Sequence, residues 1–211
     1  MSESISSTPV TAIVLAAGAS KRMGAPKLAL PFAGSTILET TLSHLLEGGV
    51  DEIILVVGLD EGVEKIARSH GERCIRTVHN RNPEAGMLRS AQIGVEATSP
   101  ERDFMIALAD QPTVPAIMIR RLIETFSQRR PDVLVPVFAG KRGHPLLLSH
   151  RLRQPLLDLG AESTLRDLVH AYPIVECSVE TDDIHRDIDT KERYEEEVRR
   201  TDFGRLRAPR L

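Results

Sequence analysis

The sequence has little of what would build a nucleic-acid-binding, membrane-bound or disulfide-linked protein. Its 211 residues include no Trp, 2 Tyr and 5 Phe, too few aromatic side chains for the stacking platforms that bind single-stranded nucleic acid. The net charge is -3, so a general binder of nucleic acid or of anionic membranes is not expected. The 2 cysteines, Cys74 and Cys177, form no CxxC pair, which fits a cytoplasmic protein.

Long apolar runs are also missing. No stretch approaches the roughly 18 consecutive apolar residues of a membrane span. Residues 1–8 are polar, and we expect them to form a disordered tail rather than a signal peptide. Residues 201–211 have no apolar period and are expected to form a second disordered tail. Residues 9–200 are then predicted to be a single domain, since no linker divides them.

Within that domain, short apolar runs alternate with helical patterns. Thr36 followed by Glu39 predicts a capping box at the start of one helix, which Gly48 and Gly49 would end. Strands are predicted at 10–15, 53–57, 74–78, 104–109, 133–137 and 173–179, and helices from Thr36 onward and at 62–69, 87–97, 117–126, 152–159, 163–171 and 191–200. This order predicts an α/β fold with a mostly parallel sheet and helices on both faces.

Ligands of open α/β sheets bind beyond the carboxyl ends of the strands, and the loop after the first strand has unusual composition there. Small residues at 16–18 allow backbone N–H groups to approach an anion closely, while Arg22 and Lys27 add positive charge. Neither a GxxxxGK[ST] nor a GxGxxG motif is present, because Gly18 and Gly24 are six positions apart. The composition fits phosphate binding, or a simple turn with two solvated basic side chains.

Acidic residues lie at the end of another predicted strand and near the end of the chain. Asp110 directly follows the apolar run 104–109, where a carboxylate serves either as a metal ligand or as a helix N-cap. Asp187 and Asp189 form a second acidic pair, in which Asp189 or Thr190 could instead cap the last helix. If both segments face one crevice, two carboxylates would share Mg²⁺, which prefers few carboxylates together with phosphate oxygens.

Taken together, these segments resemble the nucleotidyltransferase family that includes the cytidylyltransferase and guanylyltransferase of the molybdenum cofactor. The resemblance spans roughly residues 10–200 and rests on LAAGASKRMGAPK (15–27), NPEAGMLRS (82–90), ALADQP (107–112), GHP (143–145) and DIDT (187–190). It implies a Rossmann-like nucleotidyltransferase fold. It also implies condensation of a nucleoside triphosphate with a phosphate-bearing acceptor, with release of pyrophosphate.

The resemblance also implies roles for individual residues. Arg22 and Lys27 would hold the triphosphate, and Asp110 would hold Mg²⁺ together with Asp189, a stronger candidate than Asp187. Arg22, Lys27 and Asp110 form the expected catalytic set. The remaining expected contacts are the nucleotide with Leu15, Ala16, Ala17, Gly18 and Ser90, and the acceptor with His144, which could instead hydrogen-bond the backbone in a tight turn. Arg166 is a further candidate for binding the acceptor.

Nucleotide and acceptor are predicted from smaller features. Ala17 stands where guanylyl-transferring members have Gly, and this favours CTP. The GxxGAR-like segment of cytidylyltransferases is replaced by residues 160–166, where Arg166 could supply the missing cation. The alternative there is an ordinary helix start, capped by Glu162 or Ser163, with Arg166 solvated.

The predicted function is Mg²⁺-dependent transfer of CMP from CTP to the phosphate of molybdopterin. Guanylyl transfer, or a sugar or polyol phosphate as the acceptor, is the alternative within the same class. A non-catalytic cofactor carrier is the alternative outside it. A client molybdoenzyme is a further partner that the resemblance allows.

Met87 is expected to pack in the interior.

Overall fold

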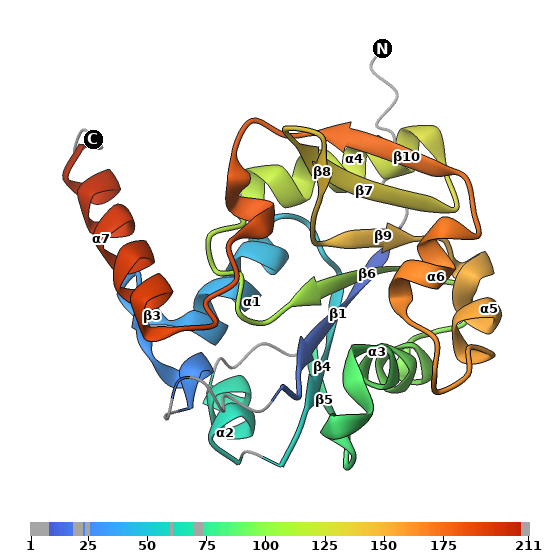
Figure 1. Ribbon diagram of the computed structural model, residues 1–211, viewed down its shortest axis with the longest axis horizontal. Coiled ribbons are helices and arrows are strands. Elements are labelled where there is room, and N and C mark those ends of the chain that lie inside the picture. The colour runs from blue at the N-terminus through green and yellow to red at the C-terminus, as the bar shows by residue number, and fades with distance from the viewer. Residues whose placement is uncertain (1–8, 19–22, 24–25, 60, 70–73, 208–211) are drawn as a thin grey trace.

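The structure is a computed structural model that describes residues 9–18, 23, 26–59, 61–69 and 74–207. A twisted sheet runs through the middle of the molecule, with helices packed against it (Figure 1). Along the sheet the strand order is β10-β7-β9-β6-β1-β4-β5, and β8 pairs with β7. The strands are β1 (Val10–Ala16), β4 (Glu52–Val57), β5 (Ile75–His79), β6 (Asp103–Leu108), β7 (Val133–Phe138), β8 (Lys141–Arg142), β9 (Leu146–Leu148) and β10 (Ile174–Ser178).

The centre of the sheet is parallel, and its strands are apolar on both faces because the helices that connect parallel strands cover both sides of the sheet. β1 pairs in parallel with β4 on one side and β6 on the other. Ala12, Ile13 and Val14 of β1 are each 0% exposed, so this strand is covered from above and below. β9 is inserted antiparallel between β6 and β7, which the sequence pattern did not predict as a strand.

Two apolar cores lie on opposite faces of the sheet. One includes buried side chains of α1 and α4, and the other includes those of α3, α5 and α6. The helices are α1 (Ile37–Glu47), α2 (Glu61–Ser69), α3 (Gly86–Ala97), α4 (Ala116–Arg129), α5 (Arg153–Leu157), α6 (Leu165–His170) and α7 (Lys191–Arg207). The predicted α/β fold, with a mostly parallel sheet and helices on both faces, is confirmed.

Helix α1 begins as its sequence predicts. The Thr36 side chain accepts from the Glu39 backbone N–H at 3.2 Å, and the Thr36 backbone N–H donates to Glu39 Oε2 at 3.1 Å. Such a capping box satisfies two N–H groups that the first turn leaves unpaired, and a cap of this kind contributes about 1 kcal/mol. Gly48 is the C-cap, and Gly49 has a φ of +98° that favours glycine.

Helix α7 corrects one predicted boundary. The helix runs from Lys191 to Arg207, whereas a disordered tail was expected from residue 201. Figure 1 shows α7 beside the short hairpin of β2 (Pro31–Phe32) and β3 (Ser35–Thr36), and Tyr194 Oη donates to the Pro31 carbonyl there at 2.8 Å. The expected tail at residues 1–8 lies outside the described residues. In the described part of the chain, no helix combines the length and apolar character that crossing a membrane requires.

Candidate functional site

The carboxyl ends of β1 and β6 lie side by side and carry the first candidate residues. Leu15 of β1 is in register with Leu108 of β6, and the Ala109 N–H donates to the Leu15 carbonyl at 3.3 Å. Asp110, two residues beyond the end of β6, therefore lies near Ala16, the last residue of β1, and near the loop that begins at residue 17. This edge is where open α/β sheets bind their ligands.

Lys27 connects this edge to the end of the chain. It opens the short 3₁₀ helix η1 (Lys27–Ala29), and its Nζ donates to Asp110 Oδ2 at 2.5 Å and to Asp189 Oδ1 at 2.7 Å. The side chains of Lys27, Asp110 and Asp189 are 12%, 18% and 35% exposed, respectively. We call these three residues the Lys27 cluster. Since the cluster is partly removed from water, its charges interact more strongly than they would on an open surface.

The pKa values in the cluster show how its charges are balanced. Burial raises the pKa of Asp110 above its ordinary value, although the ion pair and hydrogen bond with Lys27 oppose that shift. Asp187 and Asp189 raise the pKa of Asp110 further by repulsion. Burial acts to lower the pKa of Lys27, but attraction and hydrogen bonds from Asp110 and Asp189 more than offset it and raise that pKa. In the cluster, two carboxyl groups therefore surround the single ammonium group of Lys27.

The two acidic residues of the DIDT segment have different surroundings. Asp187 Oδ1 accepts from Gln111 Nε2 at 2.5 Å, whereas Asp189 turns toward Lys27. Ile188 between them is 0% exposed. Of the two residues that the sequence left as alternatives, Asp189 is the one that shares the Lys27 ammonium group with Asp110.

The capping interpretation of Asp110 is wrong. α4 begins only at Ala116, with Pro115 as its N-cap residue. At the last helix, by contrast, Thr190 Oγ1 accepts from the Arg193 backbone N–H at 3.3 Å, as a cap does. Thr190, and not Asp189, therefore caps α7, and the Asp189 carboxylate binds Lys27.

Of the residues expected at the nucleotide, the first loop is described only in part. Ala16 and Ala17 are 5% and 7% exposed. Gly18 is exposed, and a Cβ there would meet no atom within 4 Å. A Cβ on Gly58, by contrast, would lie 3.0 Å from the Ala17 carbonyl oxygen, so Gly58 lets β4 approach the loop closely. Arg22 lies outside the described residues.

Ser90 is held at the end of β5. It lies in α3, it is 5% exposed, and its Oγ accepts from Asn80 Nδ2 at 2.9 Å. Asn80 is itself 1% exposed, and its backbone N–H donates to Val57 at the end of β4. Ser90 and Asn80 therefore form a buried polar pair at the carboxyl ends of two neighbouring strands. Sequence reasoning did not identify Asn80, whose signal is its place directly after a predicted strand.

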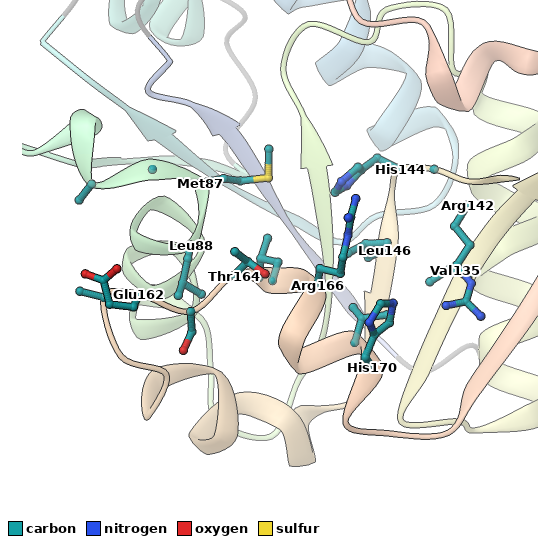
Figure 2. A pocket seen from close by; sticks show the side chains of 17 residues that line it. Met87, Leu88, Val135, Arg142, His144, Leu146, Glu162, Thr164, Arg166 and His170 are labelled. Atoms are coloured by element: carbon teal, nitrogen blue, oxygen red, sulfur yellow. The ribbon is translucent and has the colours of Figure 1, made fainter.

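A cavity of about 690 Å³ brings the two expected acceptor residues together. His144 reaches it from the loop before β9, and Arg166 reaches it from the first turn of α6. Figure 2 shows the Arg166 side chain extending toward the His144 ring. The charge of Asp187 acts on both His144 and Asp110, so the His144 side of the cavity and the Lys27 cluster share an electrostatic neighbour.

The surroundings of His144 favour the neutral form of its ring. Burial lowers its pKa below the ordinary 6.5, although the hydrogen bond to Ile106 and the charge of Asp187 oppose that shift. Its Nδ1 lies 3.4 Å from the Ile106 carbonyl oxygen, which can only accept a hydrogen bond. Nδ1 therefore carries the proton, and Nε2 keeps its lone pair.

Arg166 is exposed, and its helix start differs from the predicted one. Thr164 is the N-cap of α6 and forms a capping box with Asp167, whereas Glu162 or Ser163 was expected to cap this helix. The capping box fixes the first turn, from which Arg166 lines the cavity while its side chain remains exposed to solvent.

Among the other residues that line the cavity, Arg142, His170 and Met87 have functional groups that were not predicted there. Arg142 precedes the GHP segment and forms an ion pair with Glu176 at 2.8 Å. His170 ends α6. Met87 was expected to pack in the interior, but it is 47% exposed and lies at the cavity (Figure 2). For Arg142, the available signal in the sequence was its place two positions before His144.

The sequence of residues 12–176 matches the model of the MobA-like NTP transferase domain. This match covers most of the chain. The protein belongs to the MobA-like NTP transferase domain family.

Two curated relatives of this MobA-like protein cover nearly the whole domain. Nicotine blue oxidoreductase of Paenarthrobacter nicotinovorans is 30% identical over 87% of this chain and 93% of that protein. Molybdenum cofactor cytidylyltransferase of Escherichia coli K12 is 30% identical over 89% of this chain and 98% of that protein. The resemblance to molybdenum cofactor enzymes is confirmed, but relatives with different named activities are equally similar.

Solved structures agree on the fold. The crystal structure of Rv0371c from Mycobacterium tuberculosis H37Rv superposes with a TM-score of 0.76 at 27% identity, covering 91% of this chain and 99% of that one. The manganese complex of the same protein gives a TM-score of 0.72 at 26% identity, with the same coverage. Lys27 and Asp110 of this MobA-like domain lie inside the matched family range, whereas Asp189 lies beyond it.

Proposed function

We propose that this chain is a Mg²⁺-dependent nucleotidyltransferase that moves CMP from CTP to the phosphate of molybdopterin and releases pyrophosphate. The observation that carries the proposal is the Lys27 cluster, in which Asp110 and Asp189 share one cation at the carboxyl ends of the central strands. Family membership and the similarity to a molybdenum cofactor cytidylyltransferase support the same reaction class.

The residues present fit a divalent metal ion. Asp110 and Asp189 already approach a single cation to within 2.7 Å, so both carboxylates can face one ligand. In the described part of the chain, no group of three or more His, Cys, Asp or Glu side chains is arranged to hold a metal unaided. Two carboxylates suit Mg²⁺, which takes its other ligands from phosphate and water. When bound, it would neutralise charge on the reacting phosphate oxygens.

Nucleotidyl transfer needs no nucleophile from the protein. An oxygen of the acceptor phosphate forms a bond to the α-phosphorus of CTP, and the bond to the β-phosphate oxygen breaks, so that its electron pair leaves with pyrophosphate. The acceptor phosphate is ionised near pH 7, so no general base is required. Lys27, together with Arg22, would neutralise the leaving pyrophosphate and orient the triphosphate.

The cavity at His144 and Arg166 is the proposed acceptor site. Its volume of about 690 Å³ lies within the usual range of small-molecule pockets, roughly 300–1,000 Å³. Arg166 would bind an anionic group of the acceptor. His144, being neutral with a free Nε2 lone pair, would accept a hydrogen bond from an N–H or O–H group rather than bind an anion.

CTP is the preferred nucleotide in this proposal because of Ala17, and Ser90 would lie near the base. Guanylyl transfer is the alternative, and a sugar or polyol phosphate is the alternative acceptor. Two other candidates are an oxidoreductase activity, suggested by the name of one relative, and a non-catalytic carrier. Neither needs a lysine shared by two carboxylates, so the Lys27 cluster favours transfer over both.

Thermal unfolding with single nucleotides tests the proposal first. A ligand at one hundred times its Kd adds about 2.7 kcal/mol of stability, which raises the Tm of a protein of this size by roughly 5–10 °C. We expect a Mg²⁺-dependent rise with CTP that exceeds those with GTP, ATP and UTP. A larger rise with GTP would replace cytidylyl by guanylyl transfer, and a rise with NADPH alone would overturn nucleotidyl transfer.

Turnover is then measured as pyrophosphate release from CTP and Mg²⁺ with molybdopterin. Mass spectrometry of the product should show the added CMP. Ribose 5-phosphate and glycerol 3-phosphate serve as competing acceptors of the alternative class. Release with either of these, and none with molybdopterin, would refute molybdopterin as the acceptor while leaving nucleotidyl transfer intact.

A further inference from the structure

A buried ion pair joins Glu197 to Arg186, which lies three positions before Asp189 of the Lys27 cluster in the sequence. Arg186 and Glu197 are 5% and 1% exposed. Arg186 donates from Nε to Glu197 Oε1 at 2.9 Å and from Nη2 to the same oxygen, and its Nη1 contacts Asp182 Oδ1 at 3.3 Å. Glu197 belongs to α7, and Arg186 belongs to the segment that leads to Asp189. The matched family range ends at residue 176, before either residue.

Between Arg186 and Asp189 the chain is fixed at each step. Asp187 accepts from Gln111, and the Gln111 amide also donates to the Ile184 carbonyl at 3.2 Å. Ile188 is fully buried, and its backbone N–H donates to the carbonyl oxygen of Asp110 at 3.0 Å. The segment therefore touches the β6 end through its middle, while Arg186 holds its beginning to α7.

The end of the segment is held by the same helix. Thr190 caps α7, directly after Asp189. Asp189 thus lies between two attachments to α7, the Arg186–Glu197 pair before it and the Thr190 cap after it. Movement of α7 relative to the sheet would carry the Asp189 carboxylate away from Asp110.

Anchoring α7 does not by itself require a buried charge pair. Tyr194 and Val198 already pack α7 against the core, and Tyr194 Oη binds the Pro31 carbonyl. Replacing a buried ion pair with apolar side chains of similar volume is often neutral or stabilising. Arg186 and Glu197 do, however, offer a directional contact, since two N–H groups of one guanidinium converge on one carboxylate.

We propose that Arg186 and Glu197 are positioning residues that set the Asp189 carboxylate opposite Asp110. The inference rests on the proposed function in that it assigns Asp189 to the metal site, but its structural part concerns this chain alone. Partners that orient metal ligands from behind typically contribute 10- to 100-fold in metal affinity or activity.

The test uses the double variant Arg186→Met with Glu197→Leu in the full-length protein. It removes both charges together, so no unpaired charge stays buried, and we expect its Tm to remain close to that of the wild type. Hydrogen–deuterium exchange without ligands should show faster exchange at the Ile188 amide, because the hydrogen bond to Asp110 opens more often. Mn²⁺ binding, measured by electron paramagnetic resonance with CTP present, should weaken at least tenfold.

The matched control lies on the same helix. Arg193 and Glu196 form an exposed pair at 3.3 Å, with side chains 45% and 47% exposed. Arg193→Met with Glu196→Leu removes the same kinds of charge, and it should change neither Ile188 exchange nor Mn²⁺ binding. Unchanged Ile188 exchange and Mn²⁺ affinity in the buried double variant would overturn the proposal.

A gentler variant covers the case in which the buried double variant does not fold. Asp182→Asn removes the charge at the half-exposed third contact of Arg186 and leaves Glu197 in place. It should change Ile188 exchange and Mn²⁺ affinity in the same direction but less, and no change would count against the proposal. If the wild type binds neither Mn²⁺ nor CTP, the proposed function fails, while Ile188 exchange still decides the positioning role.

Discussion

The backbone N–H of Ile188 donates to the carbonyl oxygen of Asp110 at 3.0 Å. This contact joins the end of a central strand to a segment that follows all the strands in the sequence. Ile188 is fully buried, so the contact fixes the segment against the domain, and the next residue, Asp189, reaches the Lys27 ammonium group. The Asp110 and Asp189 carboxylates consequently meet at Lys27.

Lys27→Met should remove most of the activity. The variant keeps an unbranched side chain, one atom shorter, but loses the charge that would neutralise pyrophosphate. Loss of one such contact commonly lowers kcat by about 10²–10³. Pyrophosphate release under saturating CTP and Mg²⁺ measures the effect. Lys65→Met, at an exposed position on α2, is the matched control and should keep wild-type kcat. A Lys27→Met enzyme with a kcat within twofold of the wild type would remove Lys27 from the mechanism.

Asp110→Asn should separate activity from stability. Its raised pKa means that the ionised carboxylate is disfavoured in the folded protein, so the Asp110 contribution to stability falls as pH rises from 3.8 through the folded pKa. At pH 7.5 the neutral amide avoids that penalty, and Lys27 keeps Asp189 as a partner. We expect a Tm equal to or above that of the wild type, with kcat reduced at least a hundredfold. A Tm several degrees lower would show that the ion pair outweighs burial.

Much of the fold follows from local signals. The capping box of Thr36 and Glu39 and the apolar run of β1 each specify their own element. β9 has only three residues, Leu146–Leu148, too few to show a period, and its antiparallel place between β6 and β7 depends on distant strands. The sequence predicts the end of α7 at residue 200 because the residues after it have no apolar period. A polar sequence can nevertheless continue a helix that packing has started.

The candidate site was predictable residue by residue but not as an arrangement. Lys27, Asp110 and Asp189 stand out as charges after apolar segments, yet nothing local indicates that they bind one another. The choice of Asp189 over Asp187 depends on their partners, Lys27 for Asp189 and Gln111 for Asp187, which only the tertiary structure supplies. Arg186 and Glu197 lie in ordinary polar sequence, and their burial results from packing of α7 against the domain.

His144→Gln should change how stability depends on pH. Burial lowers the folded pKa of His144 below 6.5, so the unfolded chain binds more protons between the two values. The free energy of unfolding of the wild type should therefore rise with pH across that window and level off above 6.5. Urea unfolding at several pH values measures it. His144→Gln should show a smaller rise, and identical pH profiles would mean that His144 titrates normally in the folded state.

Ser90→Ala should destabilise the protein through Asn80. The variant leaves the Asn80 Nδ2 group, buried at the end of β5, without its hydrogen-bond acceptor at 2.9 Å. A buried donor left unsatisfied costs about 1–3 kcal/mol, measurable by urea unfolding. Ser90→Ala with Asn80→Leu removes both polar groups, and it should recover part of the loss unless the pair contributes nothing to stability.

Arg166→Gln should affect the acceptor and spare the nucleotide. Arg166 is exposed and projects into the cavity toward His144, so its loss removes a cation without disturbing the core. We expect KM for the acceptor to rise about tenfold or more, since a hydrogen bond to a charged group contributes roughly 1.5–3 kcal/mol. The Tm shift with CTP should stay unchanged. Arg129→Gln, exposed at the end of α4, is the matched control. An Arg166→Gln variant that lost CTP binding instead would assign this part of the cavity to the nucleotide.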